Sequence, residues 1–167
     1  MRSSVFVGAV PRLGLAERMI ESRSLSLRLG SSLDSIDAGE LIVQGLARDA
    51  GHDPDDIGSL GLAVREAMVN AVRHGNQFDE QKSVYFSVEV TPYRITITVR
   101  DEGDGFDPED VPDPTSVENL LKASGRGLLL IRAYVDDVTL RRAEVGGMEM
   151  ILVKNGPKGD SDKENEE

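Results

Sequence analysis

The chain has 167 residues, of which 39% are hydrophobic and 29% charged, the balance of one ordinary globular domain. Its formal net charge of −11 repels the phosphate backbone of nucleic acids, and its 4% aromatic content leaves few rings for stacking single-stranded bases. The absence of cysteine excludes disulfide scaffolds and thiolate chemistry, and no apolar run approaches the roughly 18 residues that span a bilayer. We therefore expect neither direct nucleic-acid binding nor a membrane span.

Hydrophobic periodicity predicts a series of short elements along the chain. Residues 1–22 show no clear period and are interpreted as an N-terminal extension; Pro11 and the charges around it interrupt any signal-peptide core, so we expect a cytoplasmic protein. In chain order, the predicted elements are a strand at 24–29, a helix at 35–50, a second helix that begins after residues 53–56 and ends near 74, strands at 83–91 and 94–100, a helix at 125–134, and strands at 135–141 and 148–153.

Two segments lack such periodicity. Residues 101–124 contain several glycines and prolines, and a loop of this length in a compact domain is usually functional or disordered. No apolar residue follows Val153, so we expect a domain at 23–154 and a disordered acidic tail at 155–167. The order of elements predicts a two-layer α/β sandwich, with a mixed, mostly antiparallel sheet and helices on one face.

A polar stripe on the second predicted helix is the first candidate functional feature. Glu66 and Asn70 are four residues apart, so they lie on one helix face about 6 Å apart along the axis. A carboxamide oxygen can hold a hard cation and a carboxylate can accept a hydroxyl proton, as phosphoryl transfer requires. The alternative is a solvated helix face.

A glycine-rich turn directly after a predicted strand is the second feature. Gly103 and Gly105 would let the backbone approach a planar ligand, and Asp101 could accept a hydrogen bond from an amino group. An ordinary tight turn is the alternative. A calcium loop of the EF-hand type fits poorly, because the glycines stand where that motif places oxygen ligands.

A second glycine-rich turn, residues 124–128 (SGRGL), opens the third predicted helix. Backbone N–H groups that glycine leaves uncovered at a helix start form a phosphate cradle, to which Arg126 would add positive charge. A plain loop-to-helix junction is the alternative. The phosphate-binding patterns G-x-x-x-x-G-K-[ST] and G-x-G-x-x-G are both absent.

Together, these features resemble the N box and the two glycine boxes of the GHKL, or Bergerat, ATP-binding fold, over residues 24–153. Within that family, the segments EAMVNAVRHGN, VRDEGDGFDP and SGRGLLLIRAYVDDV are most similar to the short anti-sigma-factor serine kinases. The resemblance implies a Bergerat-type sandwich with ATP and Mg²⁺ as cofactors.

The resemblance also implies a role for individual residues. Glu66 corresponds to the general base that activates an acceptor serine, Asn70 to the Mg²⁺ ligand, and Asp101 to the carboxylate that recognises the adenine amino group. The other implied nucleotide-binding residues are Gly103 and Gly105 around the adenine, and Gly125, Arg126, Gly127 and Leu128 around the phosphates. Arg73, another implied nucleotide-binding residue, lies next to the site with His74 and Asn76, where these residues would contact phosphate or order the lid. His74 fits a helix-terminal cap equally well.

The implied function is an ATP-dependent anti-sigma-factor serine kinase that binds a sigma factor and phosphorylates a STAS-type antagonist protein. A homodimer is also expected, with the first strand and the following helix as its interface. A nucleotide-dependent binding module without phosphate transfer is the alternative, because intact binding glycines do not establish turnover. A sensor histidine kinase fragment fits poorly, because the two histidines, His52 and His74, lie in a turn and in the N box.

Two further positions bear on this interpretation. Many family members place threonine after the glycine that precedes the last strand, where this chain has Gly147 and Met148, so one polar contact to the nucleotide is in doubt. Residues 107–124 are rich in proline and acidic residues, which suits a mobile lid over ATP, with a plain surface loop as the alternative.

Overall fold

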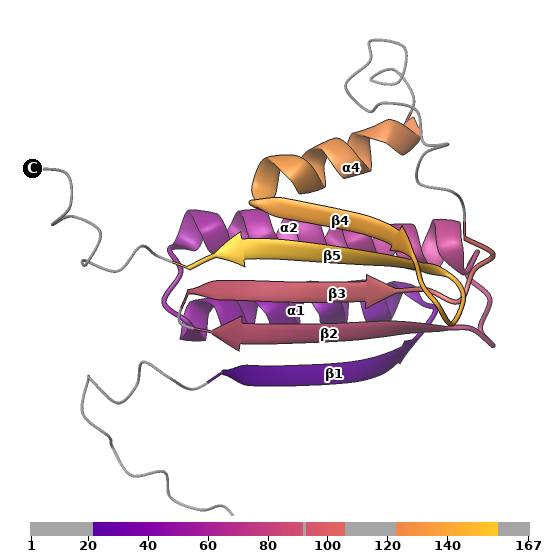
Figure 1. Cartoon of the computed structure of the whole chain (residues 1–167), viewed down its shortest axis with the longest axis horizontal. Coiled ribbons are helices and arrows are strands. Elements are labelled where there is room, and N and C mark those ends of the chain that lie inside the picture. Colours follow the sequence, from indigo (N-terminus) through magenta and orange to yellow (C-terminus); the bar gives the residue numbers. More distant parts are fainter. Residues whose placement is uncertain (1–21, 92, 106–122, 157–167) are drawn as a thin grey trace, which may run out of the picture.

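The computed structural model describes residues 22–91, 93–105 and 123–156, which form one sheet with helices on one face (Figure 1). The elements in chain order are β1 (Arg23–Gly30), α1 (Leu33–Asp49), α2 (Pro54–Val69), the π-helical segment η2 (Asn70–Gly75), β2 (Ser83–Thr91), β3 (Arg94–Arg100), α4 (Ala123–Tyr134), β4 (Asp137–Arg142) and β5 (Met148–Asn155). The predicted two-layer α/β sandwich is confirmed.

The described strands form a five-stranded sheet in the order β1-β2-β3-β5-β4. All four pairings in it are antiparallel, so the parallel component that the prediction of a mixed sheet allowed does not occur among these strands. β5 forms a hairpin with β4 and also pairs with the edge of β3 that β2 does not occupy. As a result β5 and β3 are interior strands, and the end of β3 lies beside the start of β5, whereas the start of β3 lies beside the end of β5.

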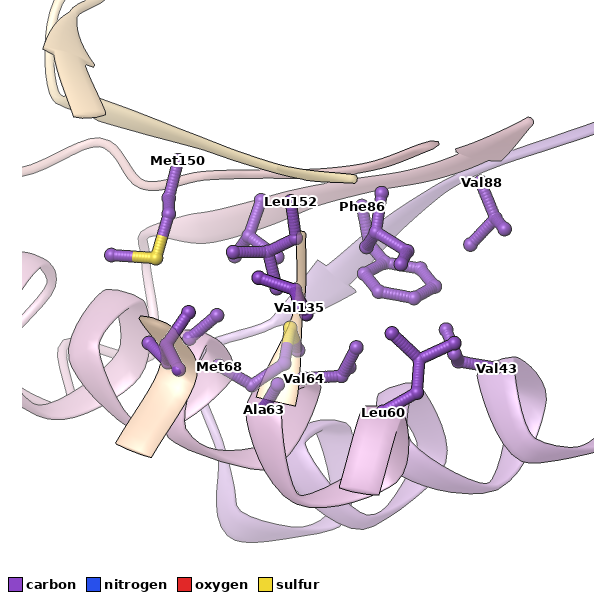
Figure 2. Close-up of a cluster of buried hydrophobic side chains, with 14 of the residues drawn as sticks. Val43, Leu60, Ala63, Val64, Met68, Phe86, Val88, Val135, Met150 and Leu152 are labelled. Atoms are coloured by element: carbon purple, nitrogen blue, oxygen red, sulfur yellow. The ribbon is translucent and has the colours of Figure 1, made fainter. Parts of the chain in front are cut away.

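One face of the sheet and the facing sides of the helices form the core (Figure 2). Side chains alternate along β2 and β3, because successive residues of a strand point to opposite faces. The largest fully buried side chains are Phe86, Leu60, Met68, Ile95, Ile97, Ile131, Leu152, Val43, Val64, Val72, Val84 and Val88. Each of them stabilises the fold by about 1.5–3 kcal/mol relative to an exposed side chain. This packing holds α2 and α4 against the sheet and so fixes the positions of their polar residues.

Side-chain caps start both long helices. Ser32 Oγ accepts from Ser35 N before α1, and Asp53 Oδ1 accepts from Asp56 N at 2.8 Å before α2. Helix α2 then continues into η2, in which the N–H of Asn76 donates to the carbonyl of Ala71, five residues earlier, at 2.8 Å. The sequence predicted one helix ending near His74; its last turn is wider than an α-helical turn, a feature frequent at functional sites.

The end of the last strand differs from the prediction. β5 continues to Asn155, the first residue of the predicted tail and two residues past the predicted strand, although no apolar residue is buried there. Polar contacts hold this end: Lys154 Nζ pairs with Asp56 Oδ1 at 2.9 Å, and Asn155 N donates to Asp136 Oδ2 at 2.7 Å.

Three predictions lie outside the described residues: the N-terminal extension, most of the lid, and the tail beyond residue 156. Among the helices that the structure does describe, none combines the length and apolar character needed to cross a membrane.

Candidate active site

A cavity of about 420 Å³ opens between the end of α2 with η2, the start of α4 and the ends of the central strands. Its size lies within the range of about 300–1,000 Å³ typical of small-molecule sites. Asn70 and Asp101, from two separate motifs of the sequence, both line it. Much of its remaining wall is apolar, formed by Val99, Leu128, Leu140 and Met150. The cavity therefore combines an apolar wall with a few polar groups.

Asp101 is buried at the end of β3, where its side chain is tied to β5. Its Oδ1 accepts from the backbone N–H of Gly103 at 2.8 Å and from that of Met148 at 3.1 Å. Both of these N–H groups donate to the same carboxylate oxygen. Burial raises the pKa of Asp101, and the two N–H donors oppose that rise only in part.

Three glycines allow the close packing around Asp101. A Cβ at Gly75 would overlap the Asp101 carboxylate, and a Cβ at Gly103 would overlap the carbonyl of Gly75. Gly147 has a φ of +82°, and a Cβ there would overlap the Asp101 carbonyl. The end of η2, the turn after β3 and the turn before β5 therefore meet at one carboxylate, and larger residues would separate them.

Glu66 and Asn70 meet the start of α4 at Gly127. An ideal Cβ on Gly127 would lie 2.9 Å from Glu66 Oε2 and 3.9 Å from Asn70 Oδ1. Leu128, the next residue, lines the cavity. The polar stripe of α2 and the glycine turn of α4 are therefore in direct contact, beside the cavity that also contains Asp101.

The other predicted site residues differ in whether they line the cavity. Gly105 lines the cavity, as does His74, whereas Arg73 is exposed and is not among the cavity residues. Gly125 and Arg126 lie in the first turn of α4, where the structure does not describe side chains, so the predicted role of Arg126 is outside what it describes.

Asn76 has a structural role, which the sequence did not indicate. Its side chain is fully buried; Nδ2 donates to the carbonyl of Ser83 at 2.9 Å, and Oδ1 accepts from Glu102 N at 2.8 Å. The carboxamide thus joins the end of η2 to β2 and to the turn after β3. It orders the backbone beside Asp101, and it is bonded to protein rather than directed at a ligand.

Sequence reasoning missed Gln77, Leu140 and Met150 as cavity residues. Leu140 and Met150 reach the cavity only because β5 lies between β3 and β4, an order that no local pattern encodes. Met148, which stands where many family members have threonine, lines the cavity, and its N–H donates to Asp101 Oδ1. That main-chain hydrogen bond is independent of the residue type.

Comparisons with known proteins identify the family of this chain. Residues 31–154 match the histidine kinase-like ATPase domain family. The serine-protein kinase RsbW of Bacillus subtilis is 30% identical over 128 residues, which cover 73% of this chain and 80% of that protein. Its namesake in Bacillus licheniformis is 34% identical over 107 residues, covering 60% of this chain and 67% of that protein.

A solved structure shows the same fold. The crystal structure of the RsbU and RsbW domains of a Mycobacterium tuberculosis protein aligns with a TM-score of 0.58 at 18% identity, over 81% of this chain and 33% of that longer chain. Because the family match spans most of the chain, and the Bacillus subtilis kinase is matched over most of its length, the chain belongs to the histidine kinase-like ATPase domain family and is a protein serine kinase of the RsbW type.

Proposed function

We propose that this chain is an anti-sigma-factor kinase that binds a sigma factor and uses Mg²⁺ and ATP to phosphorylate a serine on an anti-sigma-factor antagonist of the STAS type. The observation that carries the proposal is the contact of Gly127 with Glu66 and Asn70, beside the cavity that contains Asp101. The RsbW relatives, which are serine-protein kinases, support the reaction class.

The residues around the cavity fit an adenine nucleotide. Asp101 Oδ2 would accept a hydrogen bond from the adenine amino group, against the apolar wall formed by Val99 and Met150. Gly125, in the first turn of α4, would leave its backbone N–H open to the phosphates. The described residues contain no group of three or more His, Cys, Asp or Glu side chains able to hold a metal ion. Mg²⁺ commonly takes one or two protein oxygens and completes its coordination with phosphates and water.

Asn70 Oδ1 would be the protein oxygen that holds Mg²⁺, which when bound offsets negative charge on the phosphates. Glu66 Oε2 would accept the proton of the acceptor serine hydroxyl. The serine oxygen then forms a bond to the γ-phosphorus as the bond to the β,γ-bridging oxygen breaks, and ADP leaves. The protein contributes mainly by positioning these groups, and α2 and α4 are suited to this because both are packed on the sheet.

The test is phosphate transfer from γ-labelled ATP to a candidate antagonist, with ATP affinity measured in parallel. Glu66→Gln should bind ATP like the wild type and lose most of the transfer. Glu89→Gln, which removes an exposed carboxylate from β2, should retain both. Equal transfer by wild type and Glu66→Gln would remove Glu66 from the mechanism. ATP binding without transfer by the wild type would instead favour a nucleotide-dependent binding module.

A homodimer through β1 and α1 is part of the proposal. β1 is an edge strand of the described sheet, and Leu33 and Leu41 on α1 are 65% and 67% exposed. Light scattering after size exclusion should give the mass of a dimer, and Leu41→Glu should shift it toward the monomer. Capture of a sigma factor from cytoplasmic extract, with and without ATP, tests the partner and the proposed cytoplasmic location.

A further inference from the structure

Gln77 and Phe78 form a turn that their residue types do not favour. The N–H of Asp79 donates to the carbonyl of Asn76 at 3.0 Å, and the two residues between them have φ values of +55° and +57°. Two consecutive positive φ values are typical of a type I′ turn, which strongly prefers asparagine, aspartate and glycine. Neither glutamine nor phenylalanine is suited to this region, so the turn is strained.

The surroundings of the turn maintain this conformation. Asn76, at its first position, is fully buried and bonded through its carboxamide to Ser83 and Glu102. The N–H of Phe78 donates to the carbonyl of Val72 at 2.9 Å. Strained residues of this kind persist where the rest of the structure determines them, and they are concentrated at functional sites.

The turn places Gln77, but not Phe78, on the wall of the cavity. Gln77 is two residues from Gly75, which lies directly against the Asp101 carboxylate, and seven residues from Asn70. Its other neighbour in the chain, Asn76, accepts a hydrogen bond from the N–H of Glu102, the residue after Asp101, at 2.8 Å, so Gln77 lies on the side of the cavity formed by the turn that contains Asp101. A carboxamide there offers both a donor and an acceptor to the base or the ribose of a nucleotide.

We propose that Gln77 is a nucleoside-binding residue, whose carboxamide forms a hydrogen bond with the base or ribose of the bound adenine nucleotide. The inference rests on the proposed placement of adenine at Asp101. It goes beyond the three sequence motifs, because Gln77 belongs to none of them. It also gives a reason for a glutamine at a turn position that glycine would occupy without strain.

The experiment compares Gln77→Ala and Gln77→Gly with the wild type by calorimetric titration of ATP, ADP and AMP. Both variants should bind all three nucleotides about three- to tenfold more weakly, the loss expected for one hydrogen bond. The matched control is Phe78→Gly, which changes the neighbouring strained residue outside the cavity and should leave all three affinities unchanged. Gln77→Gly should melt at a higher temperature than the wild type, because glycine adopts positive φ without strain and the glutamine side chain that it removes is exposed.

Unchanged affinities in Gln77→Ala and Gln77→Gly would overturn the inference while leaving the proposed ATP site intact. A loss confined to ATP would place the contact at the phosphates and also contradict it. If the wild type itself bound none of the three nucleotides, the proposed function would fail together with this inference. A lower melting temperature for Gln77→Gly would contradict the argument from strain.

Discussion

Replacing Gly127 by alanine should raise the stability of the fold but lower the rate of phosphate transfer, because the new methyl group would displace the carboxylate of Glu66. The new Cβ would lie 2.9 Å from Glu66 Oε2, and ordinary contact begins at 3.4 Å, so the carboxylate would move by about 0.5 Å. The end of a flexible side chain can make that movement at little cost. Alanine also favours a helix over glycine by about 1 kcal/mol, which would raise Tm by about 2–4 °C in a domain of this size.

The rate of phosphate transfer should fall in the same variant. A misplacement of about 1 Å can reduce a rate about a hundredfold, so half that shift of the proposed base predicts a loss of about tenfold or more. The assay combines thermal melts with initial rates of transfer from γ-labelled ATP. Gly58→Ala on α2 is the control, because its Cβ would have no neighbour within 4 Å; it should gain stability and keep its rate. Wild-type transfer by Gly127→Ala would refute the proposed placement of Glu66.

Two further predictions concern the polar residues around the cavity. Asn76→Ala should lower the free energy of unfolding by about 2–4 kcal/mol in urea titrations, because it leaves the buried carbonyl of Ser83 and the N–H of Glu102 without partners; a loss below about 0.5 kcal/mol would contradict the structural role. Burial raises the pKa of Asp101 in the folded state, so the stability associated with its protonated form is present in acid and is lost as pH rises through that pKa. Asp101→Asn, which stays neutral, should match the wild type near pH 4 and exceed it in stability near pH 7, and a difference that does not change with pH would argue against burial as the cause.

Local sequence patterns were sufficient to predict the central strands β2 and β3. The predicted strands at 83–91 and 94–100 coincide with β2 and β3, because both alternate between apolar and polar residues and a short turn joins them. The same reasoning predicted the layers of the fold. It did not predict the order of β3, β5 and β4, which depends on pairing between residues far apart in sequence.

For the candidate site too, local motifs predicted individual residues but not the contacts between them. The sequence predicted Glu66, Asn70, Asp101 and Gly127 as site residues from local motifs and their resemblance to a known family. The structure adds the contacts between them, which depend on how α4 packs against α2. Gln77 and the buried role of Asn76 follow from the π-helical turn and the strained turn after it, and tertiary contacts rather than residue preference determine both.

The most direct test of the account is calorimetric titration of Mg²⁺ and ATP into the wild type and into Asp101→Asn, with thermal melts to show that both are folded. We predict one nucleotide bound per chain in the wild type and no measurable binding by the variant at the same concentrations. Equal affinity in the two proteins, or no binding by the wild type at millimolar nucleotide, would contradict the claim that the cavity between Asn70 and Asp101 is the ATP site.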